Sequence, residues 1–544
     1  MSIFLLMRSS SNKREYVIDG LPKHYSNWLA AAFLVLYFAA IVLLFPPFHE
    51  LSVLLWLYCI IFIVLIIYSP KWWLWGTIIT ICVLGFVPSL YGVFNKHLID
   101  GSILSIAHIH QIQATGLKGR VISLPLLGLP PSIFIWWLRN PRVVVPRSFI
   151  PIAVFCAMMI GSSLCACMKY VDISFLPFNF NIIVPENFDK LSYARQWWQA
   201  GMPYSLMAFT LTFCFASVFG SMLLLVVYDL LSRISLLDDA FSALSIAVLI
   251  SICYGLAQMN GLVPVFTSGG NLESTFQSQG SYGVFVGIGC VLLLSRSILS
   301  DNRVGIYGLL FVFSLLGLFI NQSRTALVAL AISPILIYAG HLFLTRKGVY
   351  LLRSSKKKVV MLLIAMTLIS SFALSIPSLN KYVLQSCRNH FIVSTVQSFD
   401  FDRGLDRIFS GRMHIWAECM EIWYENPIFG CGQGQLYWEL KARRSHDTAA
   451  NQFILVLAEM GIIGFGLFLW VILSIFRDLA EPIFSKRDEY DYISWLICCS
   501  LVVCLLVQSF TVHVLHFPNL PLLIGVIVAM ALASSRTRSE LSEG

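Results

Sequence analysis

"SHDTAANQFILVLAEMGIIGFG", residues 445–466, changes from polar to apolar at Asn451. The apolar run continues to residue 476. It is therefore longer than the about 20 residues that an α-helix needs to cross the hydrocarbon core of a bilayer. Gly461 and Gly464 inside the run would permit close packing of a neighbouring helix. The stretch therefore predicts a transmembrane helix over 451–476, with polar residues gathered where the helix enters the membrane.

The rest of the chain has the same character. Of its 544 residues 58% are hydrophobic and only 12% are charged, and the mean hydropathy is +0.79. Such a composition does not suit a soluble domain of this length, so most of the chain must lie in a bilayer. About fourteen apolar runs predict spanning helices, of which 121–138 is the weakest because it contains Pro130 and Pro131. They are 27–46, 51–68, 72–94, 121–138, 150–168, 203–228, 236–258, 282–298, 304–320, 324–344, 358–377, 451–476, 491–514 and 516–535.

Charge gives the orientation of these spans. Most lysines and arginines of the short loops fall on one side of the alternating spans, together with both termini, and the positive-inside rule makes that side cytoplasmic. Examples are Arg139, Arg142, Arg147, Lys356 and Lys486. The net charge of +9 is thus mostly a signal of topology, and it predicts no nucleic-acid partner.

We therefore expect an all-α polytopic membrane protein with about fourteen transmembrane helices and one helical outer domain between spans 11 and 12. The expected layout is a cytoplasmic tail (1–26), helices 1–11 (27–377), the outer domain (378–450), helices 12–14 (451–535) and a cytoplasmic tail (536–544). The outer domain holds Cys387, Cys419 and Cys431, which permit one disulfide of undecided pairing.

Polar residues at the outer ends of spans are candidates for function. Arg324 in "LFINQSRTALVAL" falls at the start of span 10, where a charge is costly unless it is functional or paired. The alternative is an arginine that snorkels to lipid headgroups. The stretch "TSGGNLESTFQSQGSYGVF", residues 267–285, includes Gln279 and suits a polar ligand such as a sugar, although a plain loop would look similar.

The outer domain contains a predicted helix that starts near residue 410. Ser410 is a suitable N-cap, and Arg412 in the first turn lies beside free backbone amides, which is an arrangement for an anion site or for a surface ion pair. Met413, Trp416, Met420 and Trp423 recur at helical spacing, and we interpret this stripe as packing rather than as a sugar platform. Gly430, Gly432 and Gly434 predict a tight turn.

Glu459 lies eight residues into span 12, roughly 12 Å along the helix axis from Asn451. A carboxylate at that depth needs a partner, and Arg324 is a candidate. Structural pairing and catalysis are both open for this residue.

Together these pieces resemble the bacterial O-antigen ligase and O-antigen polymerase family, which also includes protein O-oligosaccharyltransferases. The matching elements are "SRTAL" (323–327), "SGR" (410–412) followed by Trp416, "NPIFGCGQG" (426–434) and "NQFILVLAEMGIIG" (451–464). No single element is diagnostic, but their order and spacing over about 323–476 are fairly specific.

The resemblance implies a metal-independent, inverting glycosyltransferase of GT-C-like fold in the bacterial inner membrane, with its active site facing the periplasm. Its donor would be an oligosaccharide on undecaprenyl pyrophosphate, its acceptor a glycan or lipid hydroxyl, and it would use no cofactor. Arg324 and Arg412 match the family's arginines, which are thought to hold the pyrophosphate. Asn451, Glu459, Ser410 and Gln279 are the expected supporting residues.

The chain departs from the family at the catalytic position. Members usually have His-Asn before the apolar helix, whereas this chain has Ala450-Asn451. Three explanations are open: His446 has taken over the role; another outer histidine such as His414, His513 or His516 serves; or a histidine-to-alanine substitution disables the enzyme.

The acceptor separates the activities within the family. We expect a polymerase, which transfers to another lipid-linked glycan, because the spans are many and no soluble module for a protein acceptor follows the last one. The alternatives are a ligase to lipid A core in lipopolysaccharide synthesis and a protein O-oligosaccharyltransferase. From another class, a polysaccharide flippase would share the topology, but the late outer domain and the lack of an internal repeat argue against transport.

Overall fold

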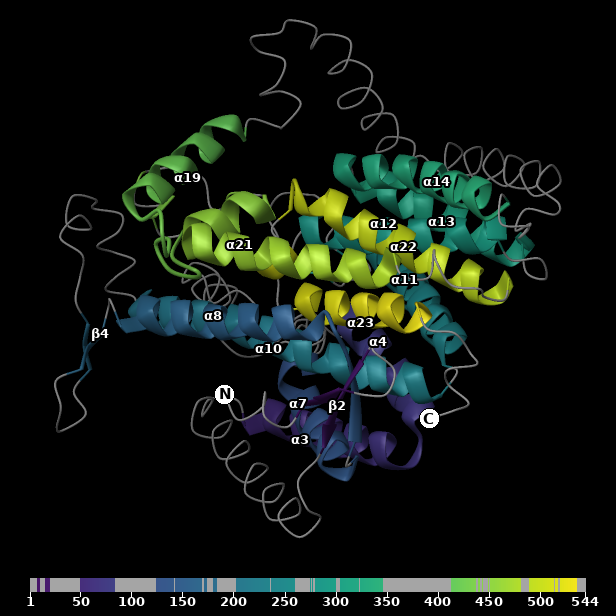
Figure 1. Ribbon diagram of the computed structural model, residues 1–544, viewed down its shortest axis with the longest axis horizontal. Coiled ribbons are helices and arrows are strands. Elements are labelled where there is room, and N and C mark those ends of the chain that lie inside the picture. The colour runs from purple at the N-terminus through teal and green to yellow at the C-terminus, as the bar shows by residue number, and fades with distance from the viewer. Residues whose placement is uncertain are drawn as a thin grey trace, which may run out of the picture.

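The protein was analysed as a computed structural model, and helices dominate it (Figure 1). The structure describes residues 7–9, 15–19, 49–83, 124–140, 142–168, 171–173, 180–182, 202–234, 236–259, 274, 276, 279–299, 304–321, 323–345, 412–436, 439–440, 443, 449, 451–480, 489–512, 514–516 and 519–535. Within these ranges the α-helices are α3 (His49–Tyr68), α4 (Pro70–Val83), α7 (Leu124–Arg139), α8 (Phe149–Met168), α10 (Met202–Arg233), α11 (Leu237–Met259), α12 (Gln279–Leu299), α13 (Val304–Asn321), α14 (Arg324–Thr345), α19 (Met413–Glu425), α21 (Gln452–Ala480), α22 (Glu489–Ser509) and α23 (Asn519–Ser534).

Except for α19, these helices fall where the apolar runs predict spans, and α7 forms in spite of Pro130 and Pro131. The spans 27–46 and 358–377 lie outside the described residues, as does the second half of 72–94. Among the described helices six are long and apolar enough to cross a membrane. The chain is therefore a multi-pass membrane protein. The six are Phe149–Ala166, Cys214–Arg233, Leu237–Gln258, Gly280–Leu299, Gln452–Ala480 and Asp491–Ser509.

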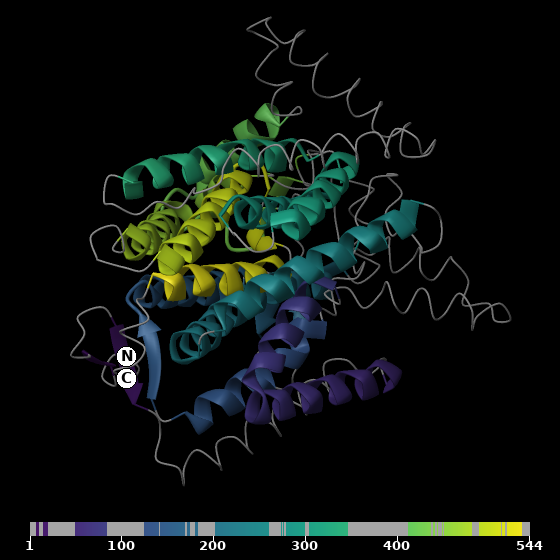
Figure 2. The same cartoon turned by 90° about the vertical axis from the view of Figure 1, so that its right-hand side faces the viewer.

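The helices pack as a bundle around α12, whose apolar window is 94% buried. Helix α12 contacts α11, α13, α14 and α22, while α23 lies between α22 and α10. Helices α3, α4 and α7 pack on one another at one side of this bundle (Figure 2), and they join it through contacts of α4 with α11 and of α7 with α10. Helices α10 and α23 approach closely because Gly220 and Gly525 face each other: a Cβ on Gly525 would lie 2.2 Å from the Gly220 carbonyl oxygen.

Two small antiparallel sheets accompany the helices and were not expected from the sequence. In the first, β1 (Met7–Ser9), β2 (Glu15–Asp19) and β3 (Arg142–Pro146) pair in that order, so the N-terminal segment lies beside the link between α7 and α8. The second sheet pairs β4 (Val171–Ile173) with β5 (Phe180–Ile182). β-branched residues such as Val143, Val144 and Val145 favour an extended strand in a link too short for a helix.

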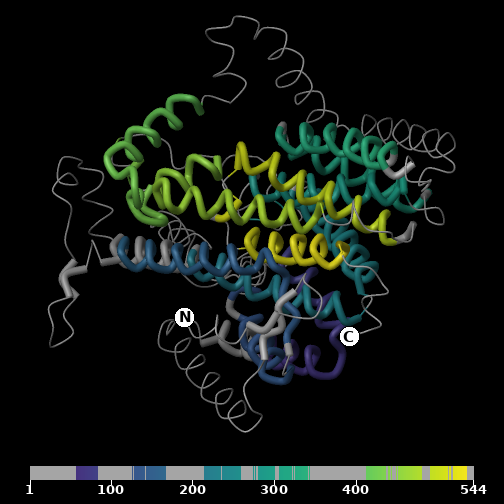
Figure 3. Tube along the Cα trace, viewed as in Figure 1, coloured from purple at the N-terminus to yellow at the C-terminus, as the bar shows by residue number. Residues whose placement is uncertain are grey.

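One end of the bundle gathers the candidate residues. Helix α21 runs alongside α8 (Figures 1 and 3), and α19 lies against α21 at the end where α8 leads into β4, on the left of Figure 1. We call this the site end. Helices α12, α14 and α22 also connect to it through the contacts described below.

Candidate active site

Helix α21 is interrupted at Gly461, where φ is +65° and ψ is −167°. An interruption leaves backbone carbonyls before it and backbone N–H groups after it without partners inside the helix. Such groups are costly inside a membrane, where no water can bind them. The break therefore requires a second segment of the chain.

Residues 427–432, which lie between α19 and α21 in the segment expected to form the outer domain, supply what the broken helix lacks. Two of their N–H groups donate to the carbonyls before the break, and two of their carbonyls accept from the N–H groups after it. The bonds run from Cys431 N to Ala458 O (2.9 Å), Gly432 N to Glu459 O (2.9 Å), Ile462 N to Pro427 O (2.9 Å) and Ile463 N to Ile428 O (3.4 Å). This segment and the first half of α21 thus form one hydrogen-bonded unit.

Glycine makes this close contact between two backbones possible. A Cβ on Gly461 would lie 2.2 Å from the Ile428 carbonyl oxygen, and one on Gly430 would lie 2.3 Å from the Glu459 carbonyl carbon. Gly430, Gly432 and Gly434 all have positive φ, so the predicted tight turn is confirmed. Gly461, which we expected only to ease helix packing, creates the break itself.

The start of α21 is fixed on both sides of position 450. The Asn451 carboxamide oxygen accepts from Phe453 N (2.9 Å) and Ile454 N (3.2 Å), so Asn451 is the N-cap of the helix. On the other side, the indole of Trp416 donates to the Ala449 carbonyl (2.7 Å). Ala450 and His446 themselves lie outside the described residues.

Arg412 reaches from the outer domain to the turn that follows α22. Its guanidinium donates to the Thr511 carbonyl oxygen (2.7 Å), a neutral acceptor that orients the group without neutralising its charge. The Thr511 hydroxyl in turn contacts the hydroxyl of Thr325 in the first turn of α14.

Arg324 is the first residue of α14, directly before Thr325, and its side chain lies outside the described residues. Helix α12 starts nearby with Gln279, whose side chain is likewise outside them. One turn later, Gly283 is so close to Ser323 that a Cβ would lie 2.7 Å from the Ser323 hydroxyl. The structure therefore brings together the starts of α12, α14 and α21 with Arg412.

Glu459 is 3% exposed and lies beside the outer domain. Burial raises the pKa of the Cys419 thiol on α19 to about 12, and the carboxylates of Glu418 and Glu459 add to the effect. The Glu459 carboxylate is therefore within electrostatic reach of α19. Whether it pairs with Arg324, as we expected, stays a prediction.

Helix α19 corrects two expectations. Its first helical residue is Met413, so Arg412 and not Ser410 is the cap residue, and the Arg412 side chain makes no capping hydrogen bond. Ser410 lies outside the described residues. The buried side of the helix is Ile415, Cys419 and Ile422 rather than the predicted stripe, of which Met413 is exposed and the others are only half-buried.

The second expectation was wrong because Ile415, Cys419 and Ile422 are the residues of α19 that join one apolar core with α21 and the chain that precedes it. That core comprises Ile415, Cys419, Ile422, Cys431, Leu436, Leu440, Ala449, Leu455 and Ala458. It packs α19 against the hydrogen-bonded unit formed by residues 427–432 and the first half of α21. Cys419 and Cys431 both lie in this core without a disulfide between them, and Cys387 lies outside the described residues.

Of the other histidines, His414 is exposed on α19 and His516 lies in a short 3₁₀ helix after α22 with its side chain outside the described residues. His513 also lies outside them. Among the described residues, no group of His, Cys, Asp and Glu could hold a metal ion.

Thr511 and Thr325 had no role in the expectations from the sequence. Thr325 lies within the quoted "SRTAL" motif, directly after Arg324. Thr511 lies near the end of the predicted span 491–514 and belongs to no charged or glycine-rich motif.

Residues 309–469 match the family model described as O-antigen ligase. The matched region begins in α13 and ends in the second half of α21. It includes Arg324, Arg412 and the segment 427–432. A comparison with curated proteins found no matching relative.

Proposed function

We propose a specific reaction for this protein. Its residues 309–469 form an O-antigen ligase family domain in a multi-pass membrane protein, which makes the chain a membrane glycosyltransferase of the ligase and polymerase type. It moves a glycan from undecaprenyl pyrophosphate to an acceptor hydroxyl at the periplasmic face of the inner membrane. We favour another lipid-linked glycan as the acceptor, which would make the protein a polysaccharide or O-antigen polymerase.

One observation carries this proposal. The guanidinium of Arg412 is held at Thr511, and Thr511 contacts the residue next to Arg324. Two arginines that are far apart in sequence thereby belong to one end of the bundle, and one of them starts a helix, where backbone N–H groups favour an anion. This is a suitable cradle for a pyrophosphate at the membrane surface.

The chemistry requires little more than that cradle and a base. The acceptor oxygen forms a bond to the anomeric carbon on the face opposite to the leaving group, while the bond from that carbon to the pyrophosphate oxygen breaks, so the configuration inverts. Arginines stabilise the negative charge that grows on the departing pyrophosphate, and they do so without a metal ion. The proton of the acceptor hydroxyl must pass to a base.

That base is the open question of this chain, because alanine at position 450 has no titratable group. Both neighbours of the position are held in place, by Trp416 and by the cap of Asn451. A histidine at this position would therefore stand at the start of α21, on the unit that also carries Glu459.

The test is a transfer assay with the purified full-length protein and a lipid-linked oligosaccharide, with and without lipid A core as a second acceptor. It compares the chain with its Ala450→His variant and resolves the products by size. We expect the histidine variant to gain activity and to give a ladder of regularly growing products. Equal activity of both proteins would move the base to His446 or another histidine, and transfer to lipid A core alone would replace polymerase by ligase. Movement of the glycan without covalent change would refute the enzyme.

A further inference from the structure

The turn that follows α22 is the place where the separate parts of the site meet. Helix α22 ends with Thr511 N and Val512 N both bonded to the Gln508 carbonyl (3.0 Å each), and the chain then leads through the 3₁₀ helix Val514–His516 to α23. The turn lies outside the region that matches the family model. Its contacts nevertheless involve three of the elements that carry candidate residues.

Two of these contacts belong to Thr511. Its carbonyl accepts from Arg412, and its hydroxyl contacts Thr325 beside Arg324. Thr511 therefore contacts both Arg412 and the first turn of α14, and it links the two.

Two further contacts tie the same turn to α21. The Leu515 N–H donates to the Gln452 carboxamide oxygen (2.9 Å), and the ring of Phe510 stacks on Phe453 with centroids 4.6 Å apart. Gln452 and Phe453 directly follow the cap residue Asn451. The turn thus also fixes the N-terminal end of α21, which follows position 450.

We propose that Thr511 is a positioning residue that sets the spacing of Arg412 and Arg324 for the two phosphates of the lipid pyrophosphate. This inference rests on the proposed function. A pyrophosphate has a fixed length, and two cations can bind it together only when their spacing matches, so a small displacement costs much of the gain. The Thr511 hydroxyl holds one side of that spacing and its carbonyl holds the other.

The experiment measures binding, so that it does not depend on the base. The purified full-length protein is titrated with undecaprenyl pyrophosphate, with the alcohol undecaprenol as the control for the lipid tail alone. The variants are Thr511→Val, which keeps the shape and removes the hydroxyl, and Thr511→Ser, which keeps the hydroxyl. Ser509→Ala is the matched control, because the Ser509 hydroxyl bonds only to Leu505 O within α22 in the described structure (2.8 Å).

We expect Thr511→Val to raise the Kd for undecaprenyl pyrophosphate on the order of tenfold, which corresponds to the loss of one orienting hydrogen bond. Thr511→Ser and Ser509→Ala should bind within about twofold of the wild type, and undecaprenol binding should be unchanged throughout. Thr325→Val combined with Thr511→Val should be no worse than either alone, because both remove the same contact.

The outcomes separate this inference from the proposed function. Equal Kd values for wild type, Thr511→Val and Thr511→Ser would overturn the positioning role alone. A lower Tm of unliganded Thr511→Val with unchanged Kd would show a purely structural role and would also overturn it. If the wild type binds undecaprenyl pyrophosphate no better than undecaprenol, or if Arg412→Ala binds as tightly as wild type, the proposed function falls too.

Discussion

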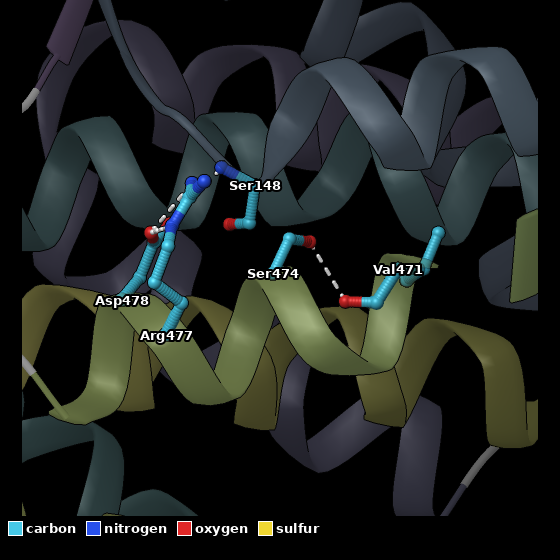
Figure 4. A network of polar contacts seen from close by, with 5 residues as sticks. All are labelled: Ser148, Val471, Ser474, Arg477 and Asp478. Atoms are coloured by element: carbon cyan, nitrogen blue, oxygen red, sulfur yellow. Dashed lines mark hydrogen bonds and ion pairs between the residues drawn. The ribbon is translucent and has the colours of Figure 1, made fainter. Parts of the chain in front are cut away.

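The two halves of α21 are continuous in sequence but differ in how their backbone is completed. The first half, residues 452–460, ends at the break and depends on the outer-domain segment 427–432 for four hydrogen bonds. The second half, residues 462–480, is a regular helix that serves as an anchor. Near its end, Ser474 bonds to Val471 O (2.8 Å) within the helix, and Asp478 accepts from Ser148 N (3.0 Å) at the start of α8 (Figure 4).

The difference shows how a membrane helix can carry a site. A regular helix satisfies its own backbone, so it can be fixed by a few side chains such as Asp478, which also pairs with Arg477. A broken helix must share its hydrogen bonds with another segment, and that segment is then held at a defined place. In this protein the shared segment is 427–432, which follows α19. The break therefore holds this segment, and with it the part of the chain that carries Arg412, against the start of α21.

The largest effect should come from closing the break. Gly461→Ala places a Cβ 2.2 Å from the Ile428 carbonyl oxygen and forces alanine into a positive φ. The backbone conformation alone costs about 1–3 kcal/mol, and the collision adds to it. We expect a large fall in the Tm of the detergent-purified protein, or loss of folded protein.

Gly466→Ala is the matched control in the second half, because nothing lies within 4 Å of a Cβ there. It should raise the Tm or leave it unchanged, since alanine is favoured over glycine in a helix by about 1 kcal/mol. Similar behaviour of the two variants would mean that the break is not a specific feature of the fold.

The second effect concerns the charge at the site end. In whichever background proves active, Arg412→Ala should lower the turnover of a lipid-linked oligosaccharide about 100- to 1000-fold, the usual loss for one donor that stabilises charge in a transition state. Arg443→Ala is the control from the same domain. That arginine bonds to Glu425 (2.6 Å) and Glu421 (3.6 Å) at the surface, so its loss should change turnover less than about threefold. Equal losses would remove the special role of Arg412.

The sequence predicted most of the helices because a bilayer imposes a simple rule: an apolar run of sufficient length spans it. It did not predict the break in α21. A glycine in an apolar run fits a close helix contact as well as a positive φ, and only the partner segment decides between them. That partner lies in a loop about thirty residues earlier, and its bonds are made by backbone atoms that leave no mark in the side-chain pattern.

The candidate site was predicted in part. Arg412 and Asn451 stood out through charge and capping chemistry, and both make contacts that hold the site end together. The buried side of α19 was predicted wrongly because tryptophan and methionine at helical spacing outweighed the smaller Ile415, Cys419 and Ile422. Thr511 could not be found, since its carbonyl is the group that binds Arg412 and every residue has a carbonyl.

A moderate effect is expected at the anchored end. Asp478→Ala removes the acceptor of the Ser148 N–H, directly before α8, and should destabilise the protein by about 0.5–2 kcal/mol, comparable to the loss of a helix cap. The Tm should fall while the affinity for undecaprenyl pyrophosphate stays constant, because the second half of α21 carries no candidate site residue. A parallel loss of affinity would show that the two halves are coupled through the helix.

The smallest effect tests the segment that completes the first half. Gln435 directly follows the glycine-rich turn and is fully buried, yet neither atom of its carboxamide has a hydrogen-bond partner among the described residues. Burying an unpaired amide costs about 1–3 kcal/mol, so a side chain of similar shape without polar atoms should be tolerated or favoured. We therefore expect Gln435→Met to keep or raise the Tm by a few degrees.

Gln508→Met is the matched control for this prediction. Gln508 is as deeply buried, but its amide donates to Val284 O (3.3 Å) and Cys504 Sγ (3.2 Å), so the same change should lower the Tm. A lower Tm of Gln435→Met would show that the Gln435 carboxamide is satisfied in solution, by an ordered water for example, which would make the loop a hydrated element. A higher Tm, with opposite signs for the two glutamines, would mean that the loop retains a polar group at the expense of its own stability. In a segment whose backbone already completes the helix of the site, that is the pattern expected of a residue kept for a task other than folding.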